Sequence, residues 1–178
     1  MSKKIVITGG PGTGKTSLIS FLEEKGYQCQ NEISRQVTLE AQKKGIDQLF
    51  LSDPILFSQQ LLEGRLKQHQ EVSHFKKTLL FYDRGLPDIP AYLNFTEVSY
   101  PDSFDTTCQT YRYDTVFLLP PWKAIYTQDN ERYETFEEAE KIHNFLIHSY
   151  QKYGYKIIEV PFGTLKERMH FMITYLAP

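Results

Sequence analysis

A glycine-rich turn near the N-terminus constrains the fold of this chain more than any other feature. The phosphate-loop pattern G-x-x-x-x-G-K-[ST] is matched at every position by residues 9–16, which read GGPGTGKT. The apolar residues 5–7 precede the turn, and Leu18, Ile19 and Leu22 follow it with helical spacing. The pattern therefore lies in the order strand, loop, helix. In that context the turn is expected to hold the phosphates of a nucleoside triphosphate.

Each part of this loop has a physical role. The glycines let backbone N–H groups approach the phosphates, and a helix that begins near Lys15 directs the positive end of its dipole toward them. We expect Lys15 to reach the β- and γ-phosphates of ATP and Thr16 to bind Mg²⁺ through its hydroxyl. The residues expected to bind the nucleotide are Gly9, Gly10, Pro11, Gly12, Thr13, Gly14, Lys15, Thr16 and Ser17.

Apolar strands alternate with helical patterns along the rest of the chain. Further strands are expected at residues 27–30 and 78–83 and within residues 114–120 and 155–161. Helices are expected over residues 32–43, from about residue 54, and after two capping boxes, formed by Thr135 with Glu138 and by Thr164 with Glu167. This alternation predicts an α/β fold in which a parallel sheet is covered by helices on both faces.

Composition limits the class of protein and its partners. No repeat or linker divides the 178 residues, so we expect a single domain over residues 1–178. A net charge of −2 and a pI near 6.2 give no electrostatic reason to expect nucleic acid as a partner. The two cysteines form no disulfide framework, and no stretch approaches the about 18–20 apolar residues of a membrane helix. We therefore expect a cytoplasmic protein with no membrane partner.

Charged residues follow two of the predicted strands. Asp83 closes the strand at residues 78–83, and ligands lie beyond the carboxyl ends of parallel strands. We therefore expect Asp83 beside the phosphate loop, where it would hold Mg²⁺ or orient the attacking group. Arg84 would bind a phosphate or an acidic substrate, or form a surface ion pair. Glu32 would accept a proton from a substrate hydroxyl, or simply begin a helix at the surface. For Asp88, an N-cap and a substrate contact are both open.

A polar segment over residues 121–135 separates the fourth predicted strand from the next helix. It carries Lys123 and Arg132. Such a segment could form a lid over the γ-phosphate, in which Arg132 neutralises charge in the transition state as an arginine finger. An ordinary surface loop is the alternative.

With these residues in place, the chain resembles a known group of compact P-loop proteins. They are classed as AAA-type ATPases and are related to the nicotinamide riboside kinase domain of NadR. The resemblance spans nearly the whole chain, and its more specific matches are the Asp83-Arg84-Gly85 block and the block at residues 129–132. It implies a three-layer, nucleotide-kinase-like P-loop fold with five parallel strands in the order 2-3-1-4-5.

The resemblance also implies the parts of a site. These are a mobile lid around Arg132, a nucleotide on residues 9–17, an adenine-contacting region near the final strand and helix, and Asp83 as the metal-site carboxylate. The chain ends one helix after its last predicted strand, so we expect no helical lid domain of the kind that ring-forming AAA motors use.

Two main functional hypotheses follow, and a third, a nucleic-acid-modifying kinase, would need a basic surface that the overall charge does not indicate. The first is an ATP- and Mg²⁺-dependent phosphotransferase acting on a small metabolite, such as a nucleoside or nicotinamide riboside. Its catalytic residues would be Lys15, Asp83, Arg132, Glu32 and Arg84, and either Glu32 or Asp83 would receive the proton of the acceptor hydroxyl. The second is a regulatory ATPase that acts through a protein partner. A GTPase is disfavoured, because the chain has no N-K-x-D motif and residues 83–85 do not match D-x-x-G. The acceptor and the oligomeric state are left open.

Overall fold

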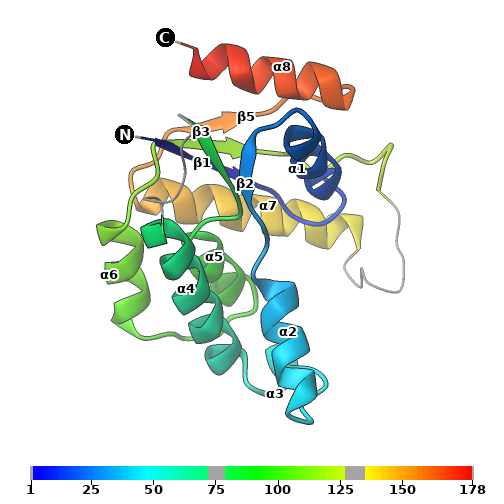
Figure 1. Cartoon of the computed structure of the whole chain (residues 1–178). Helices are drawn as coiled ribbons and strands as arrows, with labels where there is room; N and C mark the ends of the chain where they lie inside the picture. The colour runs from blue at the N-terminus through cyan, green and yellow to red at the C-terminus, as the bar shows by residue number, and fades with distance from the viewer. Residues whose placement is uncertain (1, 72–78, 127–134, 178) are drawn as a thin grey trace.

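The computed structural model describes residues 2–71, 79–126 and 135–177. A five-stranded sheet lies at its centre, with helices on both faces (Figure 1). The strands are β1 Lys3–Thr8, β2 Gln28–Gln30, β3 Leu79–Asp83, β4 Thr115–Leu118 and β5 Ile157–Glu159. Their order is β2-β3-β1-β4-β5, and all the pairings between these strands are parallel. The expected α/β fold and the strand order 2-3-1-4-5 are confirmed.

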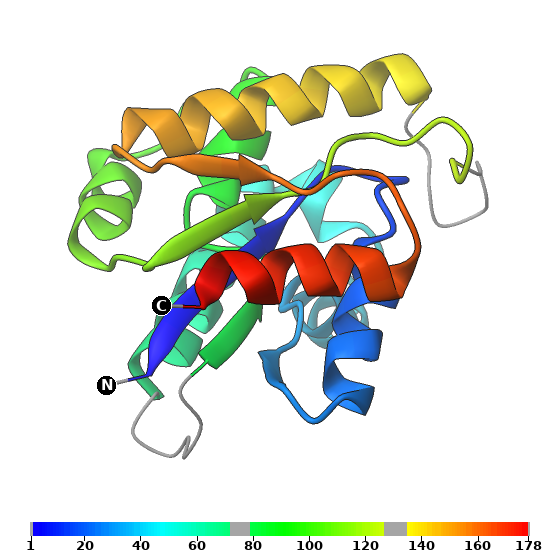
Figure 2. The ribbon, with the colours of Figure 1, turned by 90° about the horizontal axis from the view of Figure 1, so that it is seen from above.

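Helices form the two outer layers of the fold (Figures 1 and 2). One face of the sheet is covered by α1 Lys15–Glu24 and α8 Leu165–Leu176. The opposite face is covered by α4 Pro54–Gln70, α5 Asp88–Phe95, α6 Asp102–Thr110 and α7 Phe136–Lys152. Two further helices, α2 Ser34–Lys43 and the short α3 Leu49–Ser52, contact α4 below the end of β2.

The central strand β1 separates two apolar cores. Ile5 and Ile7 pack in the cluster formed with α1 and α8, whereas Val6 packs in the cluster on the opposite face. All three side chains are fully buried. A strand buried on both faces requires a continuous apolar run, which is the pattern that the sequence shows before the phosphate loop.

The helix starts follow the capping residues of the sequence. The Asp53 carboxylate accepts a hydrogen bond of 2.9 Å from the Leu56 N–H at the start of α4. Both predicted capping boxes are confirmed, at the starts of α7 and α8. The second helix begins at Ser34 and not at residue 32, so Glu32 precedes it, and the Glu32 side chain pairs with two arginines of neighbouring elements. In the part of the chain that the structure describes, no helix is long and apolar enough to span a membrane.

Candidate active site

The phosphate loop joins β1 to α1, as the sequence predicts. Its last glycine, Gly14, has a φ of 74°, a left-handed conformation that strains other residues, and α1 begins at the next residue, Lys15. Within the loop, the Thr13 hydroxyl donates a 3.0 Å hydrogen bond to the Gly10 carbonyl. No side-chain hydrogen bond caps the N-terminus of α1. A helix start of this kind has backbone N–H groups available for an anion.

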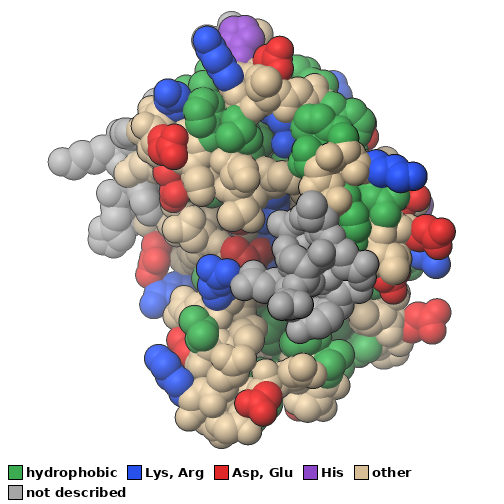
Figure 3. Space-filling model, turned by 90° about the vertical axis from the view of Figure 1, so that its right-hand side faces the viewer, with side chains coloured by type: hydrophobic (Ala, Val, Ile, Leu, Met, Phe, Trp, Pro, Cys, Tyr) green, Lys and Arg blue, Asp and Glu red, His purple; other side chains and the backbone are tan. Residues whose placement is uncertain are grey.

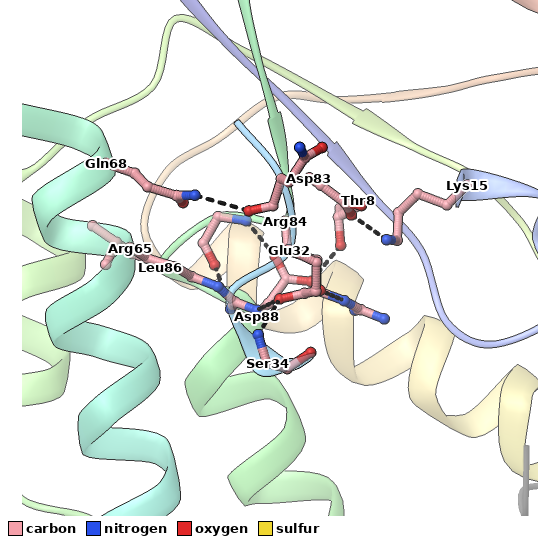
Figure 4. Close-up of polar contacts among 12 residues, drawn as sticks. Thr8, Lys15, Glu32, Ser34, Arg65, Gln68, Asp83, Arg84, Leu86 and Asp88 are labelled. Carbon is pink, nitrogen blue, oxygen red and sulfur yellow. Dashed lines mark hydrogen bonds and ion pairs between the residues drawn. The ribbon is translucent and has the colours of Figure 1, made fainter. Parts of the chain in front are cut away.

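Lys15 and Asp83 meet at the carboxyl edge of the sheet (Figure 4). The Lys15 ammonium donates a hydrogen bond to the Asp83 carboxylate, and both side chains are buried. Burial, and next the nearby Arg84, lower the pKa of Lys15, while Asp83 and Glu32 act in the opposite direction. Asp83 is predicted beside the phosphate loop because it ends a parallel strand, and in the structure it contacts Lys15 of that loop.

Two arginines form ion pairs with the carboxylate of Glu32 (Figure 4). Arg65 Nη2 lies 2.8 Å from Oε1 of Glu32, and Arg84 Nε lies 2.6 Å from Oε2. The Ser34 N–H also donates to Oε1, at 3.3 Å. Burial alone would raise the pKa of Glu32, but Arg65, Arg84 and Lys15 outweigh it and lower the pKa to about 2. Glu32 is therefore ionised at neutral pH, and both of its oxygens are already hydrogen bonded.

Asp88 fixes the position of the second of these arginines. Its side chain is 1% exposed and accepts hydrogen bonds from the Thr8 hydroxyl at 2.5 Å and from the Gly85 N–H at 2.9 Å. The Tyr150 hydroxyl donates to it at 2.6 Å, and Arg84 Nη1 lies 3.2 Å from its Oδ1. Asp88 is the first residue of α5 and not its N-cap. Its buried carboxylate holds Arg84 in place beside Glu32.

The backbone of Arg84 is strained. Its φ is 72°, in the left-handed region, and its N–H donates a 3.0 Å hydrogen bond to the Ile7 carbonyl. For a residue with a side chain this conformation costs about 1–2 kcal/mol. The ion pairs with Glu32 and Asp88 offset that cost. Backbone strain that neighbouring side chains hold in place is concentrated at functional sites.

A cavity of about 450 Å³ opens next to this charged cluster. This volume lies within the range of about 300–1,000 Å³ that is typical of small-molecule sites. Glu32, Arg65, Arg84 and Asp88 form its charged end, and Pro11 of the phosphate loop also borders it. The rest of the lining comes mainly from apolar side chains of α3, α4 and α5. It comprises Phe50, Pro54, Phe57, Leu61, Ile89, Tyr92 and Leu93, with Ser34, Ser58 and Thr96.

Comparison with models of known protein families shows which family this chain belongs to. A family model described as an AAA domain matches residues 4–168. The chain belongs to this AAA domain family. No curated protein matches it.

Solved structures with the same fold as this AAA domain include two kinds of protein. A deoxyadenosine kinase from M. mycoides, solved with the products dCMP and a flexible dCDP, superposes with a TM-score of 0.71 at 17% identity. That match covers 97% of this chain and 98% of the kinase chain. NadR in complex with NR gives a TM-score of 0.71 at 19% identity, and the match covers 98% of this chain but 48% of NadR. The AAA domain therefore has the P-loop fold of nucleotide kinases.

The structure brings four of the predicted site residues of this AAA domain together: Lys15, Glu32, Asp83 and Arg84. Thr16 and Ser17 lie in the first turn of α1 and are exposed. Arg132 lies outside the described residues, as does most of the predicted lid-like segment 121–135.

Sequence reasoning missed one member of this cluster, Arg65. Arg65 is buried in the middle of α4, where it pairs with Glu32 and donates a 3.0 Å hydrogen bond to the Gly85 carbonyl. Arg65 lies four residues after the buried Leu61, so the two side chains lie on the same face of α4. A charged residue on an otherwise apolar helix face was the signal that could have found it.

Proposed function

We propose that this chain is an ATP- and Mg²⁺-dependent phosphotransferase. It moves the γ-phosphoryl group of ATP to a hydroxyl of a small metabolite of the nucleoside or nicotinamide riboside type. The observation that carries the proposal is the cavity that ends on the ionised Glu32 and is bordered by Pro11 of the phosphate loop. A transferase needs an acceptor site next to the phosphate loop, whereas a regulatory ATPase does not.

The donor side consists of the phosphate loop and two oxygen ligands. Residues 9–17 bind the triphosphate, and Lys15 exchanges its contact with Asp83 for contacts with the β- and γ-phosphates. The exposed Thr16 hydroxyl and the Asp83 carboxylate would hold Mg²⁺. They fit that ion, because Mg²⁺ takes hard oxygen ligands and usually binds one or two protein groups together with phosphates and waters. When bound, Mg²⁺ neutralises charge on the phosphates.

Glu32 is the better candidate for contact with the acceptor hydroxyl, because it lines the cavity and Asp83 does not. The acceptor oxygen forms a bond to the γ-phosphorus while the bond to the bridging oxygen of ADP breaks. The hydroxyl proton passes to Glu32 late in this step, since the transition state of phosphoryl transfer is loose. A carboxylate with a pKa of about 2 is a weak base, so Glu32 acts mainly by orienting the hydroxyl. Arg65 and Arg84 keep its oxygens aligned.

Arg84 and Arg132 carry the remaining charge roles in the proposal. Arg84 lies at the charged end of the cavity, between Glu32 and Asp88. There it neutralises negative charge that approaches from the donor. Arg132 remains a predicted arginine finger in the segment over residues 121–135.

The aromatic part of the cavity lining suits a flat apolar ring. The Phe50 and Phe57 rings lie edge to face with centroids 6.1 Å apart, and Tyr92 lines the same cavity. The hydroxyls of Ser58 and Thr96 offer a small number of polar contacts. The deoxyadenosine kinase was solved with dCMP and dCDP, and NadR was solved with NR. An acceptor of that type, with a hydroxylated end and a planar end, fits a cavity that is lined by both charged and aromatic side chains.

A transfer assay with γ-labelled ATP and Mg²⁺ tests this function. The acceptor panel contains the common ribonucleosides, the deoxyribonucleosides and nicotinamide riboside. We expect a labelled monophosphate from at least one acceptor, and much less of it from Glu32→Gln. The exposed Glu63→Gln serves as the matched control and should retain wild-type transfer. ATP hydrolysis without a labelled product from any acceptor would count against a transferase and would favour a regulatory ATPase.

A further inference from the structure

A buried arginine on the last helix contacts the phosphate loop from the side away from the cavity residues. Arg168 lies in α8, which contacts α1 (Figures 1 and 2), and its side chain is only 2% exposed. Its Nη2 donates a 3.0 Å hydrogen bond to the Thr13 carbonyl of the loop. Its Nη1 lies 2.9 Å from the position that a Cβ on Gly14 would occupy. The guanidinium therefore touches the loop at the two residues immediately before α1.

The charge of this arginine is not balanced by a carboxylate within residues 2–71, 79–126 and 135–177. No ion pair involves Arg168 in that part of the chain, and its Nε is buried without a hydrogen-bond partner. Burial lowers the pKa of Arg168, and no neighbouring charge acts against this. The adjacent Glu167 is engaged in the capping box with Thr164.

The other buried cations around the phosphate loop each pair with a carboxylate. Lys15 pairs with Asp83, Arg65 with Glu32, and Arg84 with both Glu32 and Asp88. A buried guanidinium without a counter-charge is costly, so such a group usually faces an anion. The anion that this loop is built to bind is the phosphate chain of a nucleotide.

We propose that Arg168 is a positioning residue of the donor site, which holds the phosphate loop through the Thr13 carbonyl and supplies positive charge that the nucleotide phosphates balance. This inference rests on the proposed binding of a nucleoside triphosphate at the loop. Trp122 helps to orient Arg168, since the guanidinium carbon lies 6.0 Å from the centroid of its ring and that ring stacks on Phe162 at 5.1 Å. The last helix thereby acts on the nucleotide through the loop.

If Arg168 only held the loop in place through its hydrogen bond, its substitution would change ligand affinities in a different way. A hydrogen bond to the Thr13 carbonyl requires only a neutral donor. If that were the whole role, loss of the charge would weaken all ligands of the loop equally, or none of them. If the charge acts on phosphates, the effect must grow with the number of phosphates on the ligand.

Calorimetric titration of adenosine, AMP, ADP and ATP in the presence of Mg²⁺ separates these roles. Arg168→Gln retains a neutral donor and loses the charge, whereas Arg168→Lys retains the charge. We expect Arg168→Gln to weaken ATP and ADP binding by about 10- to 100-fold, as is typical for loss of a hydrogen-bonded charge, with less than about a 2-fold change for adenosine. Arg168→Lys should restore most of the ATP affinity. Lys166→Met, which removes an exposed cation two residues away on α8, should match the wild type.

Transfer kinetics give a second readout. In Arg168→Gln, the KM for ATP should rise by a similar factor, while the KM for the acceptor stays unchanged. Wild-type affinity for ATP in Arg168→Gln, or an equal loss for adenosine and ATP, would overturn the inference alone. Failure of the wild-type chain to bind ATP at all would overturn the proposed function and this inference together. Arg168→Gln removes a buried unpaired charge, so cooperative thermal unfolding of this variant is expected.

Discussion

Substitution of Glu32 by glutamine tests the charged cluster at the centre of the site. The Glu32 carboxylate binds Arg65 at 2.8 Å and Arg84 at 2.6 Å, and its side chain is 20% exposed. Its pKa falls from 4.5 to about 2 in the folded protein. A difference of this size corresponds to about 3 kcal/mol of stability at neutral pH, since each factor of ten in proton affinity is about 1.4 kcal/mol. Glu32→Gln should therefore lower the free energy of unfolding at pH 7 by about 3 kcal/mol.

The sign of the pH dependence follows from the direction of this shift. The folded state holds the Glu32 proton less tightly than the unfolded state does. The stabilisation is therefore complete above the unfolded pKa of about 4.5 and is lost as the pH falls through the folded pKa of about 2. The stability difference between the wild type and Glu32→Gln should accordingly shrink between these two pH values.

Urea denaturation at a series of pH values between 7 and 2 measures this difference. The control is Glu63→Gln, an exposed glutamate on α4, which should stay within about 0.5 kcal/mol of the wild type. If Glu32→Gln lost less than about 1 kcal/mol at pH 7, or if the difference did not change with pH, the ion-pair account of this cluster would be wrong. The transfer rate of Glu32→Gln should also fall, by about 10²-fold if the carboxylate orients the acceptor hydroxyl.

Substitutions at three other positions test separate parts of the site. Lys15→Ala should abolish nucleotide turnover while thermal unfolding stays cooperative, and full activity would refute the phosphate-loop assignment. Arg132→Ala should lower kcat by about 10³-fold with a much smaller effect on ATP affinity, whereas an unchanged kcat would make its segment an ordinary loop. Arg84→Gly and Arg84→Ala both remove the guanidinium, but glycine tolerates the φ of 72°. Arg84→Gly should therefore be the more stable of the two by about 1 kcal/mol in urea denaturation, and equal stabilities would contradict the strain argument.

The sheet and part of the site could be predicted from the sequence because both follow short-range rules. The phosphate loop requires a strand before it and a helix after it, and fully apolar runs indicate strands buried on both faces. Parallel strands bring their carboxyl ends to one edge, so Asp83 and Glu32 could be assigned to the phosphate-loop side. That logic also predicts the meeting of Lys15 with Asp83 that the structure shows.

Two buried arginines were missed because their partners are distant in the sequence. Arg65 lies four residues from both Leu61 and His69, which are buried on the same face of α4. Arg168 lies four residues before the buried Met172, on the same face of α8. Helical periodicity shows that each arginine lies on a buried face, but it does not show which group meets the charge. That depends on how α4 and α8 pack on the sheet.

Two helices were not predicted because their own sequences carry weak signals. Along α6, which reads DSFDTTCQT, only Phe104 and Cys108 are buried, and threonine has low helix propensity. The helix α3 is one turn long, and Leu49 is its buried residue. Tertiary packing, not local propensity, stabilises such short or polar helices.

A crystal structure of the chain with a non-hydrolysable ATP analogue, Mg²⁺ and the best acceptor from the transfer assay tests the proposed phosphotransferase site most directly. We expect the triphosphate on residues 9–17, with the acceptor in the cavity and its hydroxyl about 2.6–3.2 Å from a Glu32 oxygen. A triphosphate on the loop with the acceptor bound elsewhere, or with the cavity closed by its own side chains, would contradict the proposed site.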